Sequence, residues 1–322
     1  MKILKTLLAA VAACAVAASA WAQSYPTRTI KVIVPFSAGG STDIIARLTA
    51  EQLRKELGQT VVVENVGGAA GALGTMQGMN ANPDGYTLLI ATVSTMIVYP
   101  AAHPKPQYSL DNFVPITNIA SMPNIITVTP SFPAKDLKEF IAVLKASPGK
   151  YSYATSGVGS INHMLGESFQ AYSGTKLIHV PYKGSGPAMT DVMGGQVDIL
   201  FDQFPSSKQH VDSGKLKGIG AISPQKIPGY PNIMTMEDAG LKGFTDEAWY
   251  GLLAPKGTPP DVVAKLTDAM KKTLANPELR AKLEGVGARP VGNTPAEFSI
   301  QIRSEQERMK KLVKERNIQL QD

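Results

Sequence analysis

The stretch Val32–Ala46 constrains the fold most, because it contains three backbone states in succession. Apolar residues run up to Pro35, five small residues follow at 37–41, and helical spacing begins near Asp43. This order predicts a buried strand, a tight loop and a helix N-terminus. Free N–H groups and the helix dipole attract anions to such a terminus, and Gly39 lets a ligand approach the backbone closely. An anion-binding loop and an ordinary strand-to-helix turn both remain open.

Apolar runs and helical segments alternate along the whole chain. Strands are expected at 30–34, 61–63, 86–91, 125–128, 151–155, 177–182, 197–201, 217–222 and 247–255. Helices are expected at 45–57, 137–144, 161–169, 263–274, 298–312 and from Pro187 to the glycine pair at 194–195. Residues 100–115 are rich in prolines and polar residues and are expected to wrap the surface. The alternation predicts an α/β fold with parallel sheets covered by helices, and 322 residues favour two domains. The last two helices could pack on either sheet.

The N-terminal 22 residues have the composition of a secretory signal. Two lysines precede an apolar segment, and Ala20-Trp21-Ala22 forms a small-residue cleavage site. The apolar run is too short to span a bilayer. Residues 11–14 also resemble a lipoprotein box ending at Cys14, but the residues after that cysteine stay apolar instead of forming a polar tether. We expect cleavage after Ala22, which leaves an exported chain without cysteine.

The charge balance favours a small anionic ligand or a partner near the membrane. Removal of the signal takes away two lysines and leaves 30 basic and 26 acidic side chains, a net charge of +4. The basic residues are scattered, and those of the last helix alternate with glutamates, as on a solvated helix face. Nucleic acid is therefore not an expected partner.

The pattern of the opening stretch recurs twice, at 155–161 and 183–188. Ligands of open α/β sheets bind beyond the carboxyl ends of strands, so two such loops in separate domains could hold both ends of an elongated anion. Asp202 follows a predicted strand and is expected near the same cleft. A carboxylate there suggests a ligand ammonium or hydroxyl, or a salt bridge to Lys183. His163 could line the cleft or be a packed histidine.

Catalytic and metal-binding motifs are absent from the sequence. It contains no G-x-S-x-G elbow, no Walker A loop and no H-E-x-x-H, and its four histidines are dispersed. We therefore expect no metal and no cofactor. A hydrolase using Ser156 or Ser160 remains as an alternative from another functional class.

An ordered set of motifs resembles one protein family. The motifs are Tyr25-Pro26, Val34-Pro35-Phe36-x-x-Gly39-Gly40-x-x-Asp43, Val63-Glu64-Asn65, 84–89 (DGYTLL), 180–184 (VPYKG), 194–198 (GGQVD) and 248–259 (AWYGLLAPKGTP). Together they cover essentially the whole mature chain and are similar to the Bug-type extracytoplasmic solute receptors of tripartite tricarboxylate transporters. One departure is Val66-Gly67, where many members have Arg-Pro, which puts in doubt any ion pair that the arginine makes.

The resemblance implies a type II periplasmic binding-protein fold, with two α/β lobes joined by two crossing strands. Lobe 1 would be residues 25–124 plus 246–322, and lobe 2 residues 125–245. In the family, backbone N–H groups and small side chains of one loop hold a ligand carboxylate, and a loop of the other lobe grips the far end. Carried over, the two loops are Phe36, Ser37, Ala38, Gly39 and Ser41, and Thr155, Ser156, Gly157 and Ser160.

The expected function is that of a periplasmic, non-enzymatic receptor for a small carboxylate, namely a dicarboxylate, an amino acid or an aromatic acid. It would close around the ligand as a monomer and dock on integral-membrane transporter subunits. A sensor that delivers its ligand-bound form to a signalling receptor would have the same fold, and the sequence does not separate the two.

Overall fold

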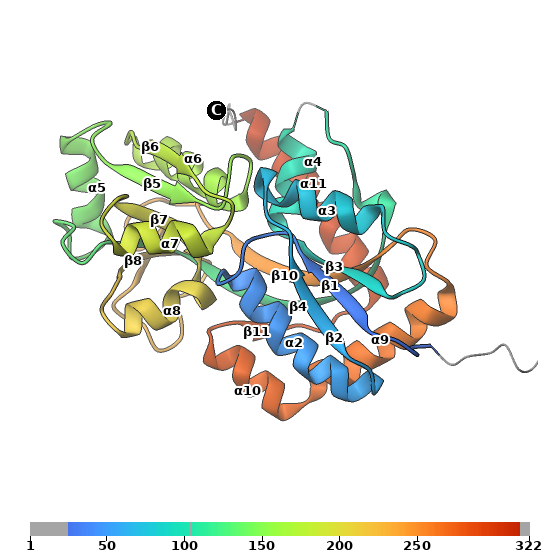
Figure 1. The fold of residues 1–322 in the computed structure, drawn as a ribbon. Coiled ribbons are helices and arrows are strands. Elements are labelled where there is room, and N and C mark those ends of the chain that lie inside the picture. The colour runs from blue at the N-terminus through green and yellow to red at the C-terminus, as the bar shows by residue number, and fades with distance from the viewer. Residues whose placement is uncertain (1–24, 104, 316–322) are drawn as a thin grey trace, which may run out of the picture.

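The computed structural model describes residues 25–103 and 105–315, so the predicted signal peptide and Cys14 lie outside the described residues. Two groups of strands form two α/β layers side by side (Figure 1). The first sheet has the order β2 (Val61–Asn65), β1 (Ile30–Val34), β3 (Thr87–Thr92), β10 (Glu247–Pro255), β4 (Phe113–Val128), with β11 (Arg289–Pro290) on the far side of β4. The second contains β6 (Ile178–Pro181), β5 (Ser152–Thr155), β7 (Ile199–Gln203), the end of β4, β8 (Lys217–Ile222) and β9 (Met234–Thr235).

The sheets are mixed, not purely parallel as predicted. β1 is parallel to β2 and β3, and β5 is parallel to β6 and β7. β10 is antiparallel to both of its neighbours, and β4 is antiparallel to all of its partners. The alternation of strands and helices describes only the parallel units, because β4 and β10 are the strands by which the chain leaves and re-enters the first sheet.

β4 belongs to both sheets. Its residues 113–123 pair with β10, and 124–128 pair with β7 and β8. The sequence prediction found only the last four residues of this strand, because Pro115, Pro123 and several polar residues interrupt the apolar pattern. The polar positions are nevertheless buried and the two prolines half-buried, because helices pack against this strand. The strand is therefore the element that fixes the position of one sheet relative to the other.

Ten α-helices cover the sheets (Figure 1). The first sheet carries α2 (Ser41–Leu57), α3 (Ala72–Met79), α4 (Tyr99–Ala102), α9 (Pro260–Ala275), α10 (Pro277–Gly285) and α11 (Pro295–Glu315), and the second carries α5 (Leu137–Ala146), α6 (Ile161–Ser173), α7 (Ser185–Met193) and α8 (Phe204–Asp212), counted over the described residues. Both late helices pack on the first sheet. The prediction missed α4, α8 and α10 and placed the start of α7 two residues late.

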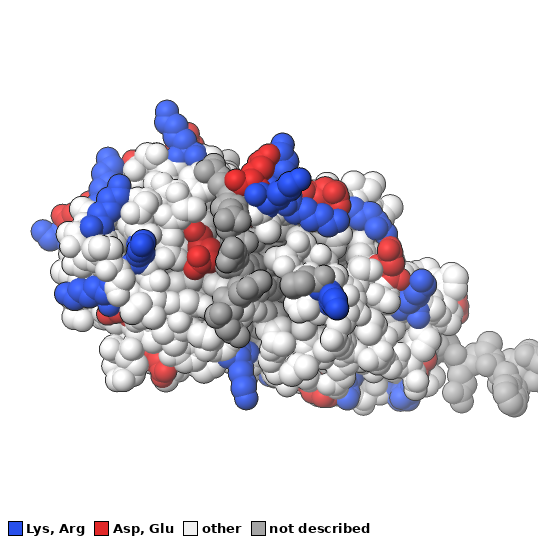
Figure 2. Space-filling model, turned by 90° about the horizontal axis from the view of Figure 1, so that it is seen from above, with Lys and Arg blue, Asp and Glu red and all other residues white. Residues whose placement is uncertain are grey.

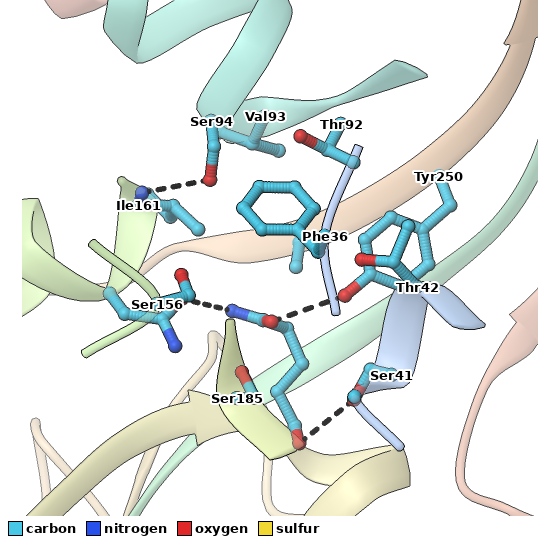
Figure 3. A pocket seen from close by; sticks show the side chains of 14 residues that line it. Phe36, Ser41, Thr42, Thr92, Val93, Ser94, Ser156, Ile161, Ser185 and Tyr250 are labelled. Atoms are coloured by element: carbon cyan, nitrogen blue, oxygen red, sulfur yellow. Dashed lines mark hydrogen bonds between the residues drawn. The ribbon is translucent and has the colours of Figure 1, made fainter. Parts of the chain in front are cut away.

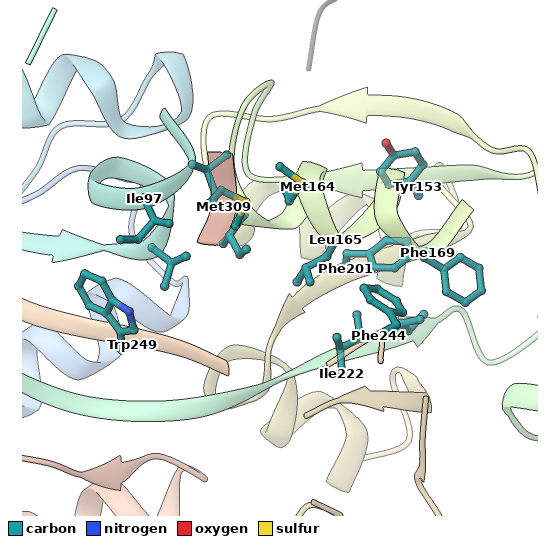
Figure 4. Close-up of a cluster of buried hydrophobic side chains, with 14 of the residues drawn as sticks. Ile97, Tyr153, Met164, Leu165, Phe169, Phe201, Ile222, Phe244, Trp249 and Met309 are labelled. Carbon is teal, nitrogen blue, oxygen red and sulfur yellow. The ribbon is translucent and has the colours of Figure 1, made fainter. Parts of the chain in front are cut away.

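The largest apolar cluster continues from one sheet into the other. It joins Trp249 and Ile97 beside the first sheet to Phe201 and Phe169 in the second (Figure 4). A second cluster lies between the first sheet and α2, α9 and α10. Burial of large apolar side chains at the junction stabilises it, since each fully buried one contributes about 1.5–3 kcal/mol.

Candidate functional site

The carboxyl ends of β1, β3, β5 and β7 meet at a small cavity between the two sheets (Figure 3). Its lining residues come from both sides: Phe36, Gly40, Ser41, Thr42, Thr92, Val93, Ser94, Ser156, Ile161, Asn162, Ser185, Gln203, Ala248 and Tyr250. The centres of water-sized molecules have about 20 Å³ there. A water needs about 10–15 Å³ on this measure, so the cavity in this state accommodates little more than one water.

Four helices begin at the cavity wall. Gly40 precedes α2, Ile161 opens α6, Ser185 opens α7 and Gln203 precedes α8. The first turn of each helix has N–H groups without intrahelical partners and a partial positive charge. None of the lining residues carries a charged side chain. The arrangement therefore suits an anion held by backbone dipoles and hydroxyls without a counter-cation.

Hydrogen bonds cross directly between the two sides of the cavity. The Ser206 N–H donates to Ser41 Oγ at 2.9 Å, and the two hydroxyl oxygens are 2.7 Å apart. The Ile161 N–H donates to Ser94 Oγ at 3.0 Å, as Figure 3 shows. The Ser37 N–H donates to the Lys183 carbonyl at 3.4 Å. These contacts make the described state a closed one.

The first predicted loop lies at this closed interface. Phe36 and Ser41 line the cavity, whereas Ser37, Ala38 and Gly39 lie beside it against residues 183–186. The loop is held in shape by Asp43, which accepts from the Gly39 N–H at 3.1 Å and also pairs with Arg47. Burial alone would raise the pKa of Asp43, but the hydrogen bonds from Arg47, Gly39 and Asn65 hold it below the ordinary value.

Of the second predicted loop, only Ser156 lines the cavity. Thr155 Oγ1 accepts from the Gly157 N–H at 3.2 Å and contacts His179 Nε2 at 2.7 Å. Ser160 is the N-cap of α6 and accepts from the His163 N–H at 3.2 Å. Thr155 and Ser160 thus shape the loop. Gly157 lies close to Ala70 of the first side, where a side chain would crowd the backbone.

His163 lies behind the second loop, as a packed histidine. Its ring stacks on His179 with centroids 3.9 Å apart, and its Nδ1 accepts from the Gly159 N–H at 3.2 Å. It is 2% exposed, and burial lowers the pKa of His163 to about 4. The imidazole is therefore neutral at pH 7, and it is not among the residues that line the cavity.

The salt bridge considered between Lys183 and Asp202 does not form in the described part of the chain. Lys183 is exposed and lines an outer groove of about 570 Å³ with Ala69, Ala70, Gly157 and Tyr182 among others. Asp202 is fully buried and accepts from Ser185 Oγ at 2.6 Å, from Asn162 Nδ2 at 3.3 Å and from Ser206 Oγ. Asp202 is buried among these donors, whereas the Lys183 side chain lies at the surface.

Burial raises the pKa of Asp202, and the hydrogen bonds from Ser185, Ser206, Gln203 and Asn162 oppose that rise. These partners lie on three helices of the second sheet and on β7 itself. Asp202 is thus an internal anchor directly behind the cavity wall, not one of its lining residues.

Several lining residues were missed by the sequence prediction. Thr92 and Ser94 follow β3 and Gln203 ends β7, so the rule that ligands bind at carboxyl ends of parallel strands could have found them. Ala248 and Tyr250 lie on β10, where no local pattern marks them. Within residues 25–103 and 105–315, no three His, Cys, Asp or Glu side chains are grouped as metal ligands.

Two α/β layers that share a strand and close over a cavity of helix N-termini define a solute-binding protein. The chain belongs to the tripartite tricarboxylate transporter receptor family (TctC), whose sequence model matches residues 45–318. It is similar to the solved periplasmic binding protein BugD, with 36% identity, a TM-score of 0.89, and coverage of 92% of this chain and 99% of the other. The Bug-type resemblance is confirmed.

Two further solved relatives were determined with ligands. A protein from R. palustris, solved with adipate, is 30% identical, with a TM-score of 0.88 and coverage of 92% of this chain and 99% of the other. MatC from Rhodopseudomonas palustris, with bound malate, is 33% identical, with a TM-score of 0.85 and coverage of 90% and 100%.

These relatives are substrate-binding proteins, and the chain is accordingly a binding protein and not an enzyme. The serine hydrolase alternative is therefore rejected. No helix in the described ranges has the length and apolar character needed to cross a bilayer. On the face seen in Figure 2, lysines and arginines stand singly or beside acidic residues and form no continuous basic patch.

Proposed function

We propose that the mature chain captures a small carboxylate in the cavity between its two sheets and delivers it to the membrane subunits of a tripartite tricarboxylate-type transporter. The observation that carries the proposal is the convergence of four helix N-termini on a cavity lined without charged side chains. Relatives solved with adipate and malate support a dicarboxylate, with amino acids and aromatic acids as the further candidates.

Binding requires the two sides to separate, because about 20 Å³ has no room for a four-carbon acid. We propose that residues 25–124 plus 246–322 form one lobe and 125–245 the other, turning relative to each other about β4 and the chain that enters β10. A ligand that contacts both lobes stabilises the closed form, because it binds that form better than the open one. Phe36, Ser41 and Ser156 would contact it directly.

A binding screen tests the carboxylate proposal. Isothermal titration calorimetry with succinate, malate, adipate, citrate, aspartate and benzoate is expected to show saturable binding for at least one of them, and glucose serves as the uncharged control. Binding of glucose with no binding of any acid would overturn the proposal.

We further propose that the chain is exported to the periplasm as a monomer after cleavage behind Ala22. Mass spectrometry of the exported protein is expected to give an N-terminus at Gln23. A lipid-modified chain beginning at Cys14 would instead establish membrane anchoring.

A further inference from the structure

Behind one wall of the cavity, side-chain hydroxyl and amide protons already have acceptors within a single hydrogen-bond network. Ser185 donates its only hydroxyl proton to Asp202 Oδ1 at 2.6 Å. The Ser206 hydroxyl donates to the other carboxylate oxygen. Asn162 Nδ2 gives one proton to the Phe201 carbonyl at 2.7 Å and the other to Asp202 at 3.3 Å. Asp202 accepts from all three side chains, so every one of these protons points away from the cavity.

Two further lining residues, Gln203 and Tyr250, have no spare side-chain proton either. Gln203 Nε2 donates to Asn162 Oδ1 at 2.9 Å and to Asn124 Oδ1 at 3.2 Å. Tyr250 donates its phenolic proton to Gln203 Oε1 at 3.1 Å. The Ser185 oxygen on this wall and the Tyr250 oxygen on β10 of the first sheet therefore offer the cavity lone pairs. On this wall the backbone N–H groups at the start of α7 and the Ser156 hydroxyl remain as donors.

The opposite wall has a different polarity. Ser94 Oγ accepts from the Ile161 N–H and retains its own proton for a ligand. Ser41 and Thr42 open α2, whose first-turn N–H groups have no intrahelical acceptors. A carboxylate oxygen of the ligand finds hydrogen-bond donors on that wall. If the same oxygen were placed against Ser185, it would face a lone pair of the hydroxyl oxygen, because the hydroxyl proton is donated to Asp202.

This polarity is independent of lobe closure. Asp202, Ser185, Asn162 and Ser206 all lie on β7 or on helices that cover the second sheet. Their hydrogen bonds to one another persist when the two sheets separate, so the orientation of the Ser185 hydroxyl is set before the ligand arrives. Such preorganisation favours the ligand that matches it.

We propose that the site selects carboxylates whose carbon chain carries a hydrogen-bond donor, a hydroxyl or an ammonium, because Asp202 orients the Ser185 hydroxyl as an acceptor toward the cavity. The inference rests on the proposed carboxylate-binding function and names its substrate class. Ser185 is the group that contacts the ligand, and Asp202 is a positioning residue acting through it.

Matched ligand pairs test the inference by titration calorimetry of the full mature chain. L-malate and L-aspartate each differ from succinate by one donor group. We expect at least one of the two to bind the wild-type chain at least about tenfold more tightly than succinate does. The added donor group gains one hydrogen bond to Ser185 Oγ, which itself donates to the Asp202 carboxyl group.

Ser185→Ala is expected to reduce that preference to below about threefold, because malate and aspartate lose a hydrogen bond that succinate does not make. Thr190→Ala removes a hydroxyl from the exposed side of the same helix, where it bonds the Gly186 carbonyl, and is expected to keep the wild-type ratio. Asp202→Asn replaces one of the two carboxyl oxygens that accept from Ser185 and Ser206 with an amide NH₂. It should also lower the malate-to-succinate affinity ratio. Circular dichroism checks that the variant is folded.

Equal affinity for malate, aspartate and succinate in wild type would overturn the inference while leaving carboxylate binding intact. Loss of all three ligands in equal measure in Ser185→Ala would do the same, since it would assign Ser185 a purely structural role. Failure of every carboxylate to bind wild type would instead overturn the proposed function.

Discussion

Gly186 lies where the second sheet's helix α7 meets the loop after β1. A Cβ built at Gly186 would lie 2.2 Å from the Ala38 carbonyl oxygen on the opposite side of the cleft. Both partners are backbone, so no side chain can move out of the way. Gly186→Ala therefore blocks full closure without adding bulk to the cavity, because Gly186 is not among the lining residues.

The cost follows from the bonds that closure makes nearby. To relieve this 2.2 Å contact, residues 38 and 186 have to move apart by about 1 Å, and we expect that movement to break the nearby Ser37–Lys183 and Ser41–Ser206 hydrogen bonds. At about 0.5–1.5 kcal/mol each, their loss removes about 1–3 kcal/mol from the closed state. Carboxylate affinity is expected to fall about 5- to 150-fold.

The free energy of unfolding of the ligand-free chain, by contrast, should rise or stay constant. Gly186 lies in α7 with an ordinary helical φ, and alanine is favoured over glycine in a helix by about 1 kcal/mol. Titration calorimetry with malate gives the affinity, small-angle scattering gives the more open shape, and urea unfolding gives the stability. Gly285→Ala in α10, where a Cβ meets open space, is the control. Wild-type affinity in Gly186→Ala would refute the closure argument.

Three further predictions concern single side chains. Ser41→Ala removes the acceptor of the Ser206 N–H. One hydrogen bond across the cleft is worth about 0.5–1.5 kcal/mol, so malate binding measured by calorimetry should weaken about 2- to 13-fold. An unchanged Kd would contradict this expectation. Burial lowers the pKa of His163 to about 4, so the unfolded chain takes up a proton below about pH 6.5 and stability is lost as pH falls toward 4, by about 3 kcal/mol. His163→Gln should flatten the urea-unfolding profile in that window, whereas His103→Gln at the surface should not. Burial raises the pKa of Asp246 to about 6, an effect that Arg308 opposes and Glu305 strengthens. Ionisation of Asp246 therefore destabilises the fold as pH rises from about 4 to 6, by up to about 3 kcal/mol. Asp246→Asn should unfold at a higher temperature than wild type at pH 7 and at an equal one at pH 4, and equal midpoints at both pH values would exclude this role.

Local patterns identified much of the scaffold. The strand ending at Val34, the helix ending at Leu57 and its left-handed Gly58 terminus follow from residue periodicity and glycine conformation. The loops that open α2 and α6 were found for the same reason, because strand, small residues and helix are adjacent in sequence. Helix α10 was missed although Asn276 caps it, since its short amphipathic pattern is weak.

Residues of the site that depend on distant segments were not predictable in this way. Tyr250 reaches Gln203 because β10 begins beside the point on β4 where β7 ends. Ser41 and Ser206 are 165 positions apart in sequence. They come into contact because β4 joins the two sheets that carry their helices. No local pattern sets that register, because it is a property of β4 pairing in two sheets at once.

The sequence by itself determined the α/β units and the loops at helix N-termini, and with them the prediction of an anionic ligand, since these depend on backbone chemistry between neighbouring residues. Tertiary structure decided what Asp202 does. Sequence placed it at a strand end near a cleft, and packing gave it Ser185, Ser206 and Asn162 in place of Lys183. The physical reason is that a buried carboxylate takes whichever donors the fold brings within hydrogen-bond distance, and those donors come from three separate helices.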